Sequence, residues 1–183
     1  GKITVRPFDG KRRKEEFELF KAIYNEAWEK NWGFVPYTTA ELNALVEGLG
    51  MIFEPKLACF GYVDNEPAGF LLAVPDFSQV LHKAQAKPGT PEPLTLIKAL
   101  WHWKLRGVIN WTRVPLMGVK EKFRNQGVDL VMYDHMLRQF ADTPYRDLDA
   151  GWVLEINTPM LNIAKTLGME RYKTHRMYEK QIT

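Results

Sequence analysis

The residues that could do chemistry in this chain gather in the stretch MGVKEKFRNQGVDLVMYDHML, residues 117–137. A short apolar run ends at Val119, a charged turn follows, and a helical pattern begins just after Gly127. The first amides of a helix have no intrahelical partner and lie at the positive end of its dipole, where they bind anions, most often phosphate. A glycine lets a phosphate approach the backbone without meeting a Cβ, and Lys122 and Arg124 add positive charge. Taken alone the stretch is a weak signal, because one glycine before a helix is more often plain loop geometry.

The elements that must position this stretch alternate between strands and helices. Alternating or continuous apolar runs predict strands, and apolar residues three or four apart predict helices. The expected strands are 3–8, 56–63, 68–74, 111–119, 150–156 and 171–180, and the expected helices are 15–32, 40–49, 94–105, 128–141 and 158–168. The Pro- and Gly-rich segment 83–93 is the clearest loop, and no linker is long enough to separate two domains. We therefore predict one α/β domain over residues 1–183, with a mixed, mostly antiparallel, twisted sheet flanked by helices.

Composition excludes several classes of protein. A net charge of +3 requires no polyanionic partner, so no nucleic acid is expected, and no apolar run approaches the roughly 18 residues of a membrane span. The only cysteine, Cys59, lies in the apolar run LACFGYV and fits a buried thiol in a reducing compartment, which predicts a cytoplasmic protein. The four histidines have no metal-ligand spacing, so no metal site is expected.

Two motifs resemble one known family. The spacing of Val119, Arg124 and Gly127 resembles the V-x-P-x-x-R-x-x-G-x-G signature of the GNAT superfamily of acyl-CoA-dependent N-acetyltransferases. The stretch VLEINTPMLNIAKTLGM, residues 153–169, is similar to the family's strand, asparagine, helix and terminal glycine, with Asn157 at the asparagine position. The order of elements agrees over nearly the whole chain, and YKTHRMYEK near the end resembles an uncharacterised bacterial subgroup.

The resemblance implies a cofactor site. An acyl-CoA, acetyl-CoA by default, would lie in the splay between two parallel strands, 112–119 and 151–156. The pantetheine would pair with backbone at Met117 and Val119, and an amide near Met117 or Gly118 would polarise the thioester carbonyl. The pyrophosphate would lie on the amides of residues 124–129. The implied cofactor-binding residues are Met117, Gly118, Val119, Arg124, Asn125, Gln126, Gly127, Val128, Asp129 and Asn157.

Three departures from the family pattern matter. Glu121 replaces the usual proline, which removes only a turn constraint. Asp129 replaces the last small residue of the loop, so its carboxylate either faces the phosphates or turns outward as a favourable charge at a helix start. The tyrosine that many relatives use as general acid falls at Ala164, which leaves the general acid unassigned.

The implied activity is transfer of an acyl group from CoA to the primary amine of a small molecule or amino acid by direct attack. Glu155, two residues before Asn157, is the candidate general base, and a structural ion pair is its alternative role. Asp76, His175 and Tyr178 are the next candidates. Two other functions stay open: a catalytically weak CoA-binding module, and an aminoacyl or peptidyl transferase of the same fold that uses no CoA.

The segment LIKALWHWKLRGVINW, residues 96–111, carries three tryptophans. Core packing or the face of a homodimer would account for it, and the alternative is a lid over a large apolar acceptor or a longer acyl chain. The acceptor, the acyl length and the oligomeric state are therefore open at this point.

Overall fold

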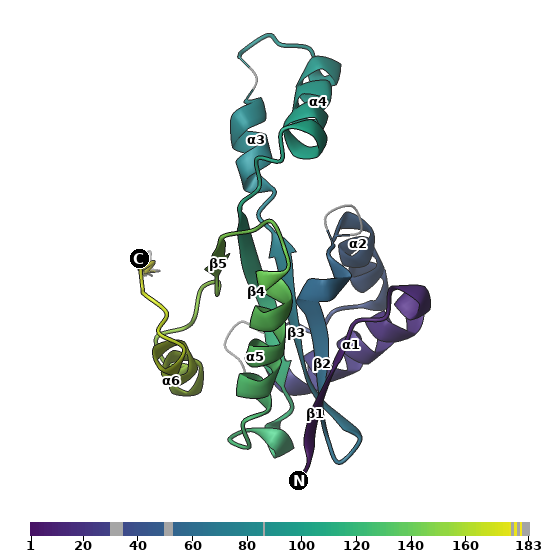
Figure 1. The fold of residues 1–183 in the computed structure, drawn as a ribbon, viewed down its shortest axis with the longest axis vertical. Coiled ribbons are helices and arrows are strands. Elements are labelled where there is room, and N and C mark those ends of the chain that lie inside the picture. The colour runs from purple at the N-terminus through teal and green to yellow at the C-terminus, as the bar shows by residue number, and fades with distance from the viewer. Residues whose placement is uncertain (30–34, 50–52, 86, 177, 179, 181–183) are drawn as a thin grey trace. The chain divides into compact units, whose positions relative to one another are not determined.

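Five strands in the order β1-β2-β3-β4-β5 make the sheet (Figure 1). The computed structural model describes residues 1–183 except 30–34, 50–52, 86, 177, 179 and 181–183. The first four strands pair antiparallel and the last pair is parallel, which confirms the predicted mixed, mostly antiparallel sheet. The strands are β1 (Ile3–Pro7), β2 (Ala58–Val63), β3 (Glu66–Pro75), β4 (Trp111–Val119) and β5 (Asp147–Asp149).

The chain forms two compact units, Gly1–Gly151 and Trp152–Thr183. The first unit contains the whole sheet, and the second contains helix α6 (Thr158–Thr166). The assignment of residues 1–183 to one domain stays a prediction.

The hairpin of β2 and β3 has the connection that the sequence predicts. Val63 pairs with Glu66 across a two-residue turn, and both turn residues, Asp64 (φ 49°) and Asn65 (φ 68°), are left-handed. Positive φ at both central residues is the requirement of a type I′ turn, whose twist matches that of the flanking strands. The sequence Asp-Asn at this point therefore determines the hairpin locally.

Strand β4 tolerates a proline because it is bulged there. Between the pairs Leu72–Leu116 and Val74–Arg113, β3 advances by two residues and β4 by three. The extra residue lies in the stretch of β4 that contains Pro115, which has no amide to donate to the ladder. The predicted bounds of this strand, 111–119, are confirmed.

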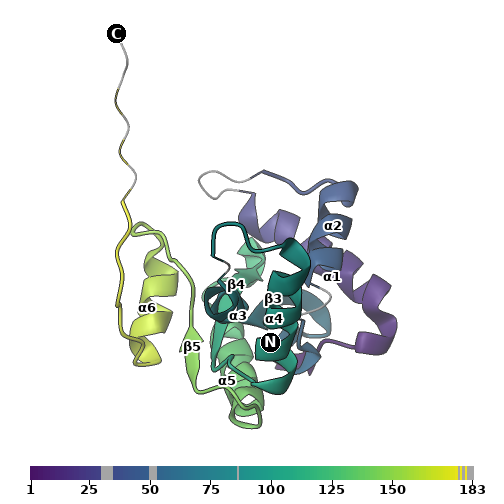
Figure 2. The same cartoon turned by 90° about the horizontal axis from the view of Figure 1, so that it is seen from above.

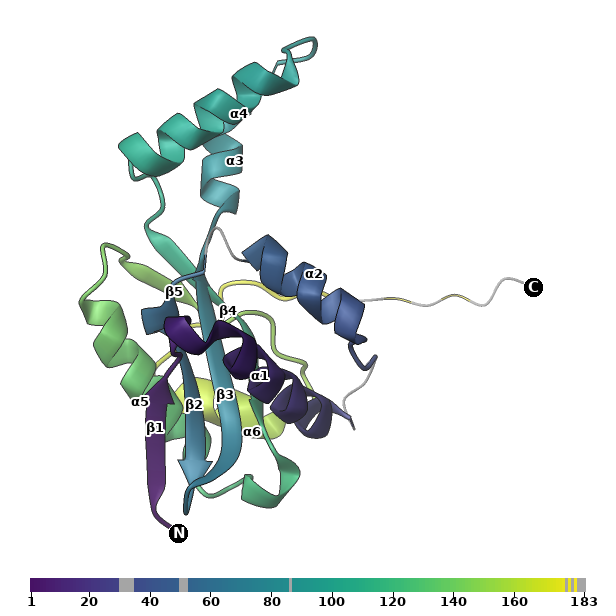
Figure 3. The same cartoon turned by 90° about the vertical axis from the view of Figure 1, so that its right-hand side faces the viewer.

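Helices cover both faces of the sheet (Figures 2 and 3). Helix α1 (Arg13–Trp28) places Phe20, Ile23 and Tyr24 in the core, where Phe20 meets Phe70 of β3 edge to face at 4.6 Å. Helix α2 (Thr39–Leu49) lies on the same face. Its start is a capping box: the Thr38 hydroxyl accepts from the Glu41 amide (3.2 Å), and the Glu41 carboxylate accepts from the Thr38 amide (2.9 Å). Thr38 is therefore the N-cap side chain of α2.

The opposite face carries helix α5 (Val128–Ala141), whose predicted bounds are confirmed. Its inner side is fully buried at Val128, Met132, Tyr133 and Met136. The helix packs closely on the sheet because a Cβ at Gly61 of β2 would lie 2.8 Å from Val128 and 3.0 Å from the Met132 sulfur. The close approach fixes the start of α5 relative to the strands.

A helical arm projects beyond one end of the sheet (Figure 1). It consists of α3 (Ser78–Ala84), α4 (Glu92–Leu100) and η3 (Trp101–Leu105), a π-helical continuation of α4. The sequence predicted the helix at 94–105 and not α3, whose seven residues are too few to show a helical period.

Two predicted strands are wrong. Residues 150–156 contain no strand: β5 ends at Asp149, and Glu155 and Ile156 lie in a turn. The described residues of 171–180 are also not strand. Both segments have the right alternation, but a strand forms only where a neighbouring strand accepts its hydrogen bonds.

Candidate functional site

The loop from β4 to α5 has a backbone that is unusual for this chain. After the short helix η4 (Glu121–Phe123), Asn125 has φ 61° and Gly127 has φ 85°. Gly127 is the N-cap of α5, it supplies no side chain to cap the helix, and a Cβ added to it would meet no atom within 4 Å. The left-handed conformation therefore explains the glycine, and the space beside it is open.

The amides of this loop make few hydrogen bonds with the residues that the structure describes. The Arg124 amide donates to Glu121 O (3.2 Å), and the Val131 amide donates to Gly127 O (3.1 Å). Between them, the amides of residues 125–129 find no acceptor among the residues that the structure describes. Amides without acceptors at the start of a 14-residue helix are the type of backbone group that binds anions in other proteins.

Asp129 faces its own helix rather than the open loop. Its Oδ1 accepts from the Leu130 amide at 2.9 Å. The carboxylate also lies near Tyr133, one turn further on, whose pKa is raised first by burial and second by this negative charge. Of the two orientations expected from the sequence, the hydrogen bond to Leu130 corresponds to the charge at a helix start.

The two basic side chains of the loop have protein partners. Arg124 Nη2 donates to Ala27 O near the end of α1 (2.7 Å), and Arg124 Nε donates to Val119 O (3.3 Å). Lys122 pairs with Glu66. Arg124 thus links the end of α1, the end of β4 and the loop.

The backbone of β4 beside the loop faces away from β3 at alternate residues. The Lys120 amide donates to Ala68 O (2.8 Å), and the register then places Gly118 opposite Phe70 as a hydrogen-bonded pair. Because such pairs alternate along an antiparallel ladder, the backbone groups of Met117 and Val119 point to the other edge of β4. These are the two residues at which the sequence predicted pantetheine pairing.

Trp28 reaches this edge from α1. Its Nε1 donates to Met117 O at 3.2 Å. A Cβ at Gly118 would lie 3.0 Å from that nitrogen and 3.1 Å from the Ala27 Cβ, so a larger residue would be tightly packed there. Sequence reasoning missed this contact, because nothing local relates residues 89 positions apart.

The parallel pairing of β4 and β5 is short. It comprises Trp111–Asp147, Thr112–Leu148 and Arg113–Asp149, after which β4 continues to Val119. Within the described part of the first unit, β4 has no strand partner on this side beyond Arg113. The predicted splay between strands 112–119 and 151–156 is therefore wrong, because residues 151–156 are not a strand. The edge of β4 where Met117 and Val119 present their backbone instead lies beyond the end of the pairing with β5.

Asp76 has a structural role in this arrangement. Its carboxylate accepts from the Ser78 amide (3.2 Å) and hydroxyl (2.6 Å) at the start of α3, and it lies 3.5 Å from Arg113 Nε. Arg113 also lies 3.6 Å from Asp149. The arginine thereby links the ends of β3 and β5, and Asp76 stabilises the turn that leads into α3.

The second unit contains two of the predicted site residues. Asn157 is the N-cap of α6, and its Oδ1 accepts from the Met160 amide at 3.3 Å. Glu155 is largely exposed and lies 3.6 Å from Arg176. Residues 150–156 are not a strand, so strand alternation does not place Glu155 on the same side as Asn157. The catalytic role of Glu155 stays a prediction.

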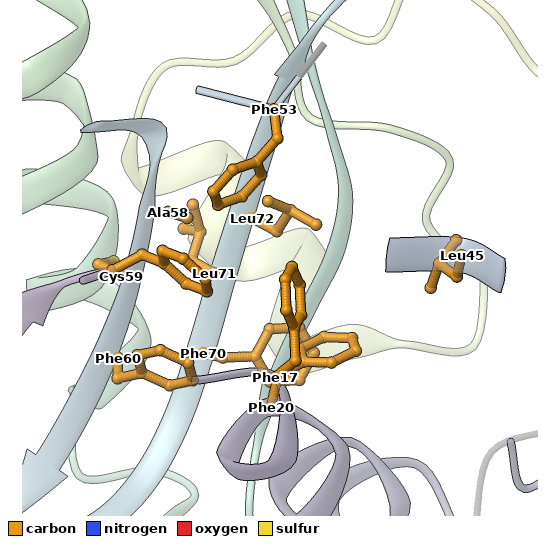
Figure 4. A pocket seen from close by; sticks show the side chains of 11 residues that line it. Phe17, Phe20, Leu45, Phe53, Ala58, Cys59, Phe60, Phe70, Leu71 and Leu72 are labelled. Atoms are coloured by element: carbon orange, nitrogen blue, oxygen red, sulfur yellow. The ribbon is translucent and has the colours of Figure 1, made fainter. Parts of the chain in front are cut away.

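An apolar hollow lies between the sheet and the helices on the α1 face (Figure 4). Its volume of about 20 Å³ is room for roughly one water molecule. Burial raises the pKa of the Cys59 thiol, which lies 3.9 Å from Met132 O of α5, to about 12, and this confirms the predicted core thiol. The lining residues are Phe8, Phe17, Phe20, Leu45, Phe53, Ala58, Cys59, Phe60, Phe70, Leu71 and Leu72.

Across the described ranges, none of the helices combines the length and the apolar character that crossing a membrane requires.

Comparison with solved structures identifies the fold. The aminoglycoside N-acetyltransferase AAC(6')-Iy, solved with a bisubstrate analogue of CoA and acetylneamine, is similar over the full length of both chains, with a TM-score of 0.60 and 14% identity. An N-acetyltransferase from Staphylococcus aureus Mu50 matches 92% of this chain and 83% of its own, with a TM-score of 0.57 and 17% identity. The chain therefore has the fold of the GNAT acetyltransferases, which confirms the fold implied by the sequence resemblance.

Two curated relatives share more of the sequence. Protein YghO of Escherichia coli K12 is 31% identical, and a bacterial ceramide synthase of Caulobacter vibrioides is 33% identical. The matches cover 99% and 98% of this chain but 46% and 47% of the relatives, so the chain spans about half of their length. No family model matches the sequence.

Proposed function

We propose that the chain is an acyl-CoA-dependent N-acyltransferase, with acetyl-CoA as the default donor and a primary amine as acceptor. The observation that carries the proposal is the row of five amides without acceptor, residues 125–129, at the start of α5. A pyrophosphate is an anion of matching size and charge for such a row. The fold supports the same ligand, because a structural neighbour was solved with CoA.

The open edge of β4 supplies the second part of the proposed site. The pantetheine arm carries amide groups, and the amides of Met117 and Val119 point to this edge. The carbonyls of the same two residues already accept from Trp28 and Arg124, so the proposed pairing uses the backbone N–H groups as donors. A thioester carbonyl near Gly118 would then be polarised by backbone N–H, in the manner of an oxyanion hole.

The proposed reaction needs no covalent enzyme intermediate. The amine nitrogen attacks the thioester carbon, the C–N bond forms, the C–S bond breaks, and the proton lost by the amine balances the thiolate that leaves. Glu155 is the proposed base, acting directly or through water.

A second candidate acceptor is a long-chain amine. The relative named bacterial ceramide synthase shares 33% identity over 98% of this chain, and ceramide is an N-acylated long-chain amino alcohol. Its formation from an acyl-CoA would make the same C–N bond with a longer donor and a longer acceptor. In this second candidate function the substrates are longer, and the proposed site is the same.

The test is calorimetric titration with CoA, followed by measurement of CoA thiol release with an amine panel. The panel pairs acetyl-CoA and palmitoyl-CoA with short amines, amino acids and a long-chain amino alcohol. CoA binding with amine-dependent thiol release supports the proposal, and release limited to the long pair selects the second candidate. Binding without release with any acceptor indicates a CoA-binding module, and no heat with CoA contradicts both.

Glu155→Gln tests the proposed base. The change keeps the side-chain shape and removes the proton acceptor, so we expect turnover at neutral pH to fall about 100-fold with CoA affinity unchanged. Arg176→Gln is the matched control, since it breaks the same ion pair and leaves the carboxylate in place. Equal losses in both variants would assign Glu155 to a structural pair.

A further inference from the structure

The helical arm carries an apolar face. Leu94, Ile97, Trp101 and Leu105 follow one another at intervals of three or four residues, which places them along one side of α4 and η3. All four are exposed, from 42% for Trp101 to 76% for Leu105. Continuous exposed apolar surface of this kind marks an interaction site.

The arm has an inner side of its own, distinct from this face. Thr95 and Ala99 are the half-buried residues of α4, and they are one helical turn apart. In η3, Trp103 packs against Phe77 edge to face at 5.3 Å. The four exposed residues are therefore not the ones that hold the arm together.

Positive charge is concentrated on the same arm. Residues 78–106 contain five basic residues and one acidic residue, a net charge of +4, whereas the 20 basic and 21 acidic residues elsewhere sum to −1. The charged residues of the arm are Lys83, Lys87, Glu92, Lys98, Lys104 and Arg106. Nearly all of the protein's positive character thus lies beside the apolar face.

The basic groups flank indole rings. Lys104 Nζ lies 3.8 Å from the centre of the Trp103 ring, and the Arg106 guanidinium lies 5.0 Å from that of Trp101. Tryptophan is favoured at the boundary between lipid headgroups and acyl chains, where lysine and arginine extend their charges toward the phosphates.

We propose that the arm binds peripherally to an anionic lipid bilayer, with the apolar face of α4 and η3 inserted at headgroup depth and the basic residues on lipid phosphates. Charge complementarity selects this occupant over a second copy of the chain. An isologous contact through the same face would bring two arms of charge +4 together. The proposal does not rest on acyl transfer, and it is tested without substrate.

The test is flotation of the 183-residue chain with vesicles of phosphatidylcholine, alone or with one third phosphatidylglycerol. We expect binding to the anionic vesicles that weakens with salt. Ile97→Glu with Leu105→Glu should lower binding at least tenfold. The matched control is Val35→Glu with Leu137→Glu, which removes two exposed apolar residues and adds the same charge outside the arm, and should leave binding unchanged.

Two further variants separate the contribution of the basic residues from that of the inserted apolar face. Lys98→Gln with Lys104→Gln should weaken binding to anionic vesicles about 25-fold, at roughly fivefold per basic residue, and change binding to neutral vesicles little. Brominated lipids should quench the tryptophan fluorescence, and Trp101→Phe should remove most of that quenching.

Three results would overturn the proposal. The first is that the protein floats with neither vesicle type. The second is that the arm variant and its control lose vesicle binding equally. The third is that light scattering shows a wild-type dimer, which Ile97→Glu with Leu105→Glu dissociates, while no protein floats with vesicles. Circular dichroism melting checks that each variant folds. If the double variant does not, Leu105→Glu alone, at the most exposed of the four positions, replaces it.

Discussion

Two helix entrances in this protein are capped in different ways. Helix α6 begins after Asn157, whose side chain accepts from the Met160 amide, and the following Pro159 has no amide to satisfy. Helix α5 begins after Gly127, which has no side chain to offer. The first entrance is closed by its own residues, and the second leaves its amides available to a ligand.

The difference teaches that a helix can begin without a side-chain cap where other contacts hold the preceding loop. Capping side chains satisfy the orphan amides of a helix and stabilise it by about 1 kcal/mol. At α5 that stabilisation is absent, and the loop is held instead by Arg124, which bonds to Ala27 and Val119. The loop is thus held in place by the Arg124 side chain and not by a cap on its amides.

The largest expected effect is at Gly127. Gly127→Asp would place a carboxylate at the open entrance, and like-charge contact with a pyrophosphate should lower CoA affinity about 100-fold or more. Gly127→Asn is the matched control, because asparagine has the same shape, tolerates the left-handed conformation and carries no charge. Calorimetry should show affinity within a few fold of wild type for the asparagine variant. Equal losses in both variants would mean that shape, not charge, excludes the ligand.

The next largest effect is expected at Arg124, which holds the loop in position. Arg124→Gln removes the bonds to Ala27 and Val119, and we expect unfolding in urea to show a loss of about 1–2 kcal/mol, with CoA affinity lowered about tenfold. Lys122→Gln is the control, since its exposed pair with Glu66 should contribute less than about 1 kcal/mol. A loss of affinity at full stability would instead place the Arg124 charge on the phosphates.

At the capped start of α6, removing the cap should lower stability rather than CoA affinity. Asn157→Ala removes the cap of α6 and should lower stability by about 1 kcal/mol. Asn157→Asp keeps an acceptor for the Met160 amide and should retain that stability. Measuring CoA affinity in both variants separates the cap from the cofactor contact implied by the family resemblance: a loss in Asn157→Ala with none in stability would assign the side chain to the cofactor.

The smallest expected effect is at Asp129. Asp129→Asn keeps an acceptor for the Leu130 amide and removes a negative charge beside the proposed pyrophosphate. We expect CoA affinity to rise about threefold, the scale of one charge at a helix start. Asp134→Asn, on the same helix and paired with Arg138, is the control and should change nothing. A weaker affinity in Asp129→Asn would show that the carboxylate assists binding.

Much of the fold was predictable because the deciding signals are local. The bounds of β4 and α5, the turn at Asp64 and Asn65, and the left-handed glycine before α5 follow from residue types within a few positions of one another. The failures are at 150–156 and 171–180, where alternation was present but a strand neighbour was not. A helix satisfies its hydrogen bonds within itself, whereas a strand needs a partner that its own sequence does not specify.

The sequence by itself therefore determined where α5 begins and that a glycine precedes it, because a glycine spacing and a helix start are local properties. Only the tertiary structure decided what surrounds the loop before α5. Trp28 donates to Met117, Arg124 reaches Ala27, and Pro115 lies at a bulge of β4, because distant segments are packed together in one core. The short pairing of β5 with β4 likewise ends at Arg113. Contacts between residues far apart in the chain depend on how helices and strands pack, and no single segment encodes that packing.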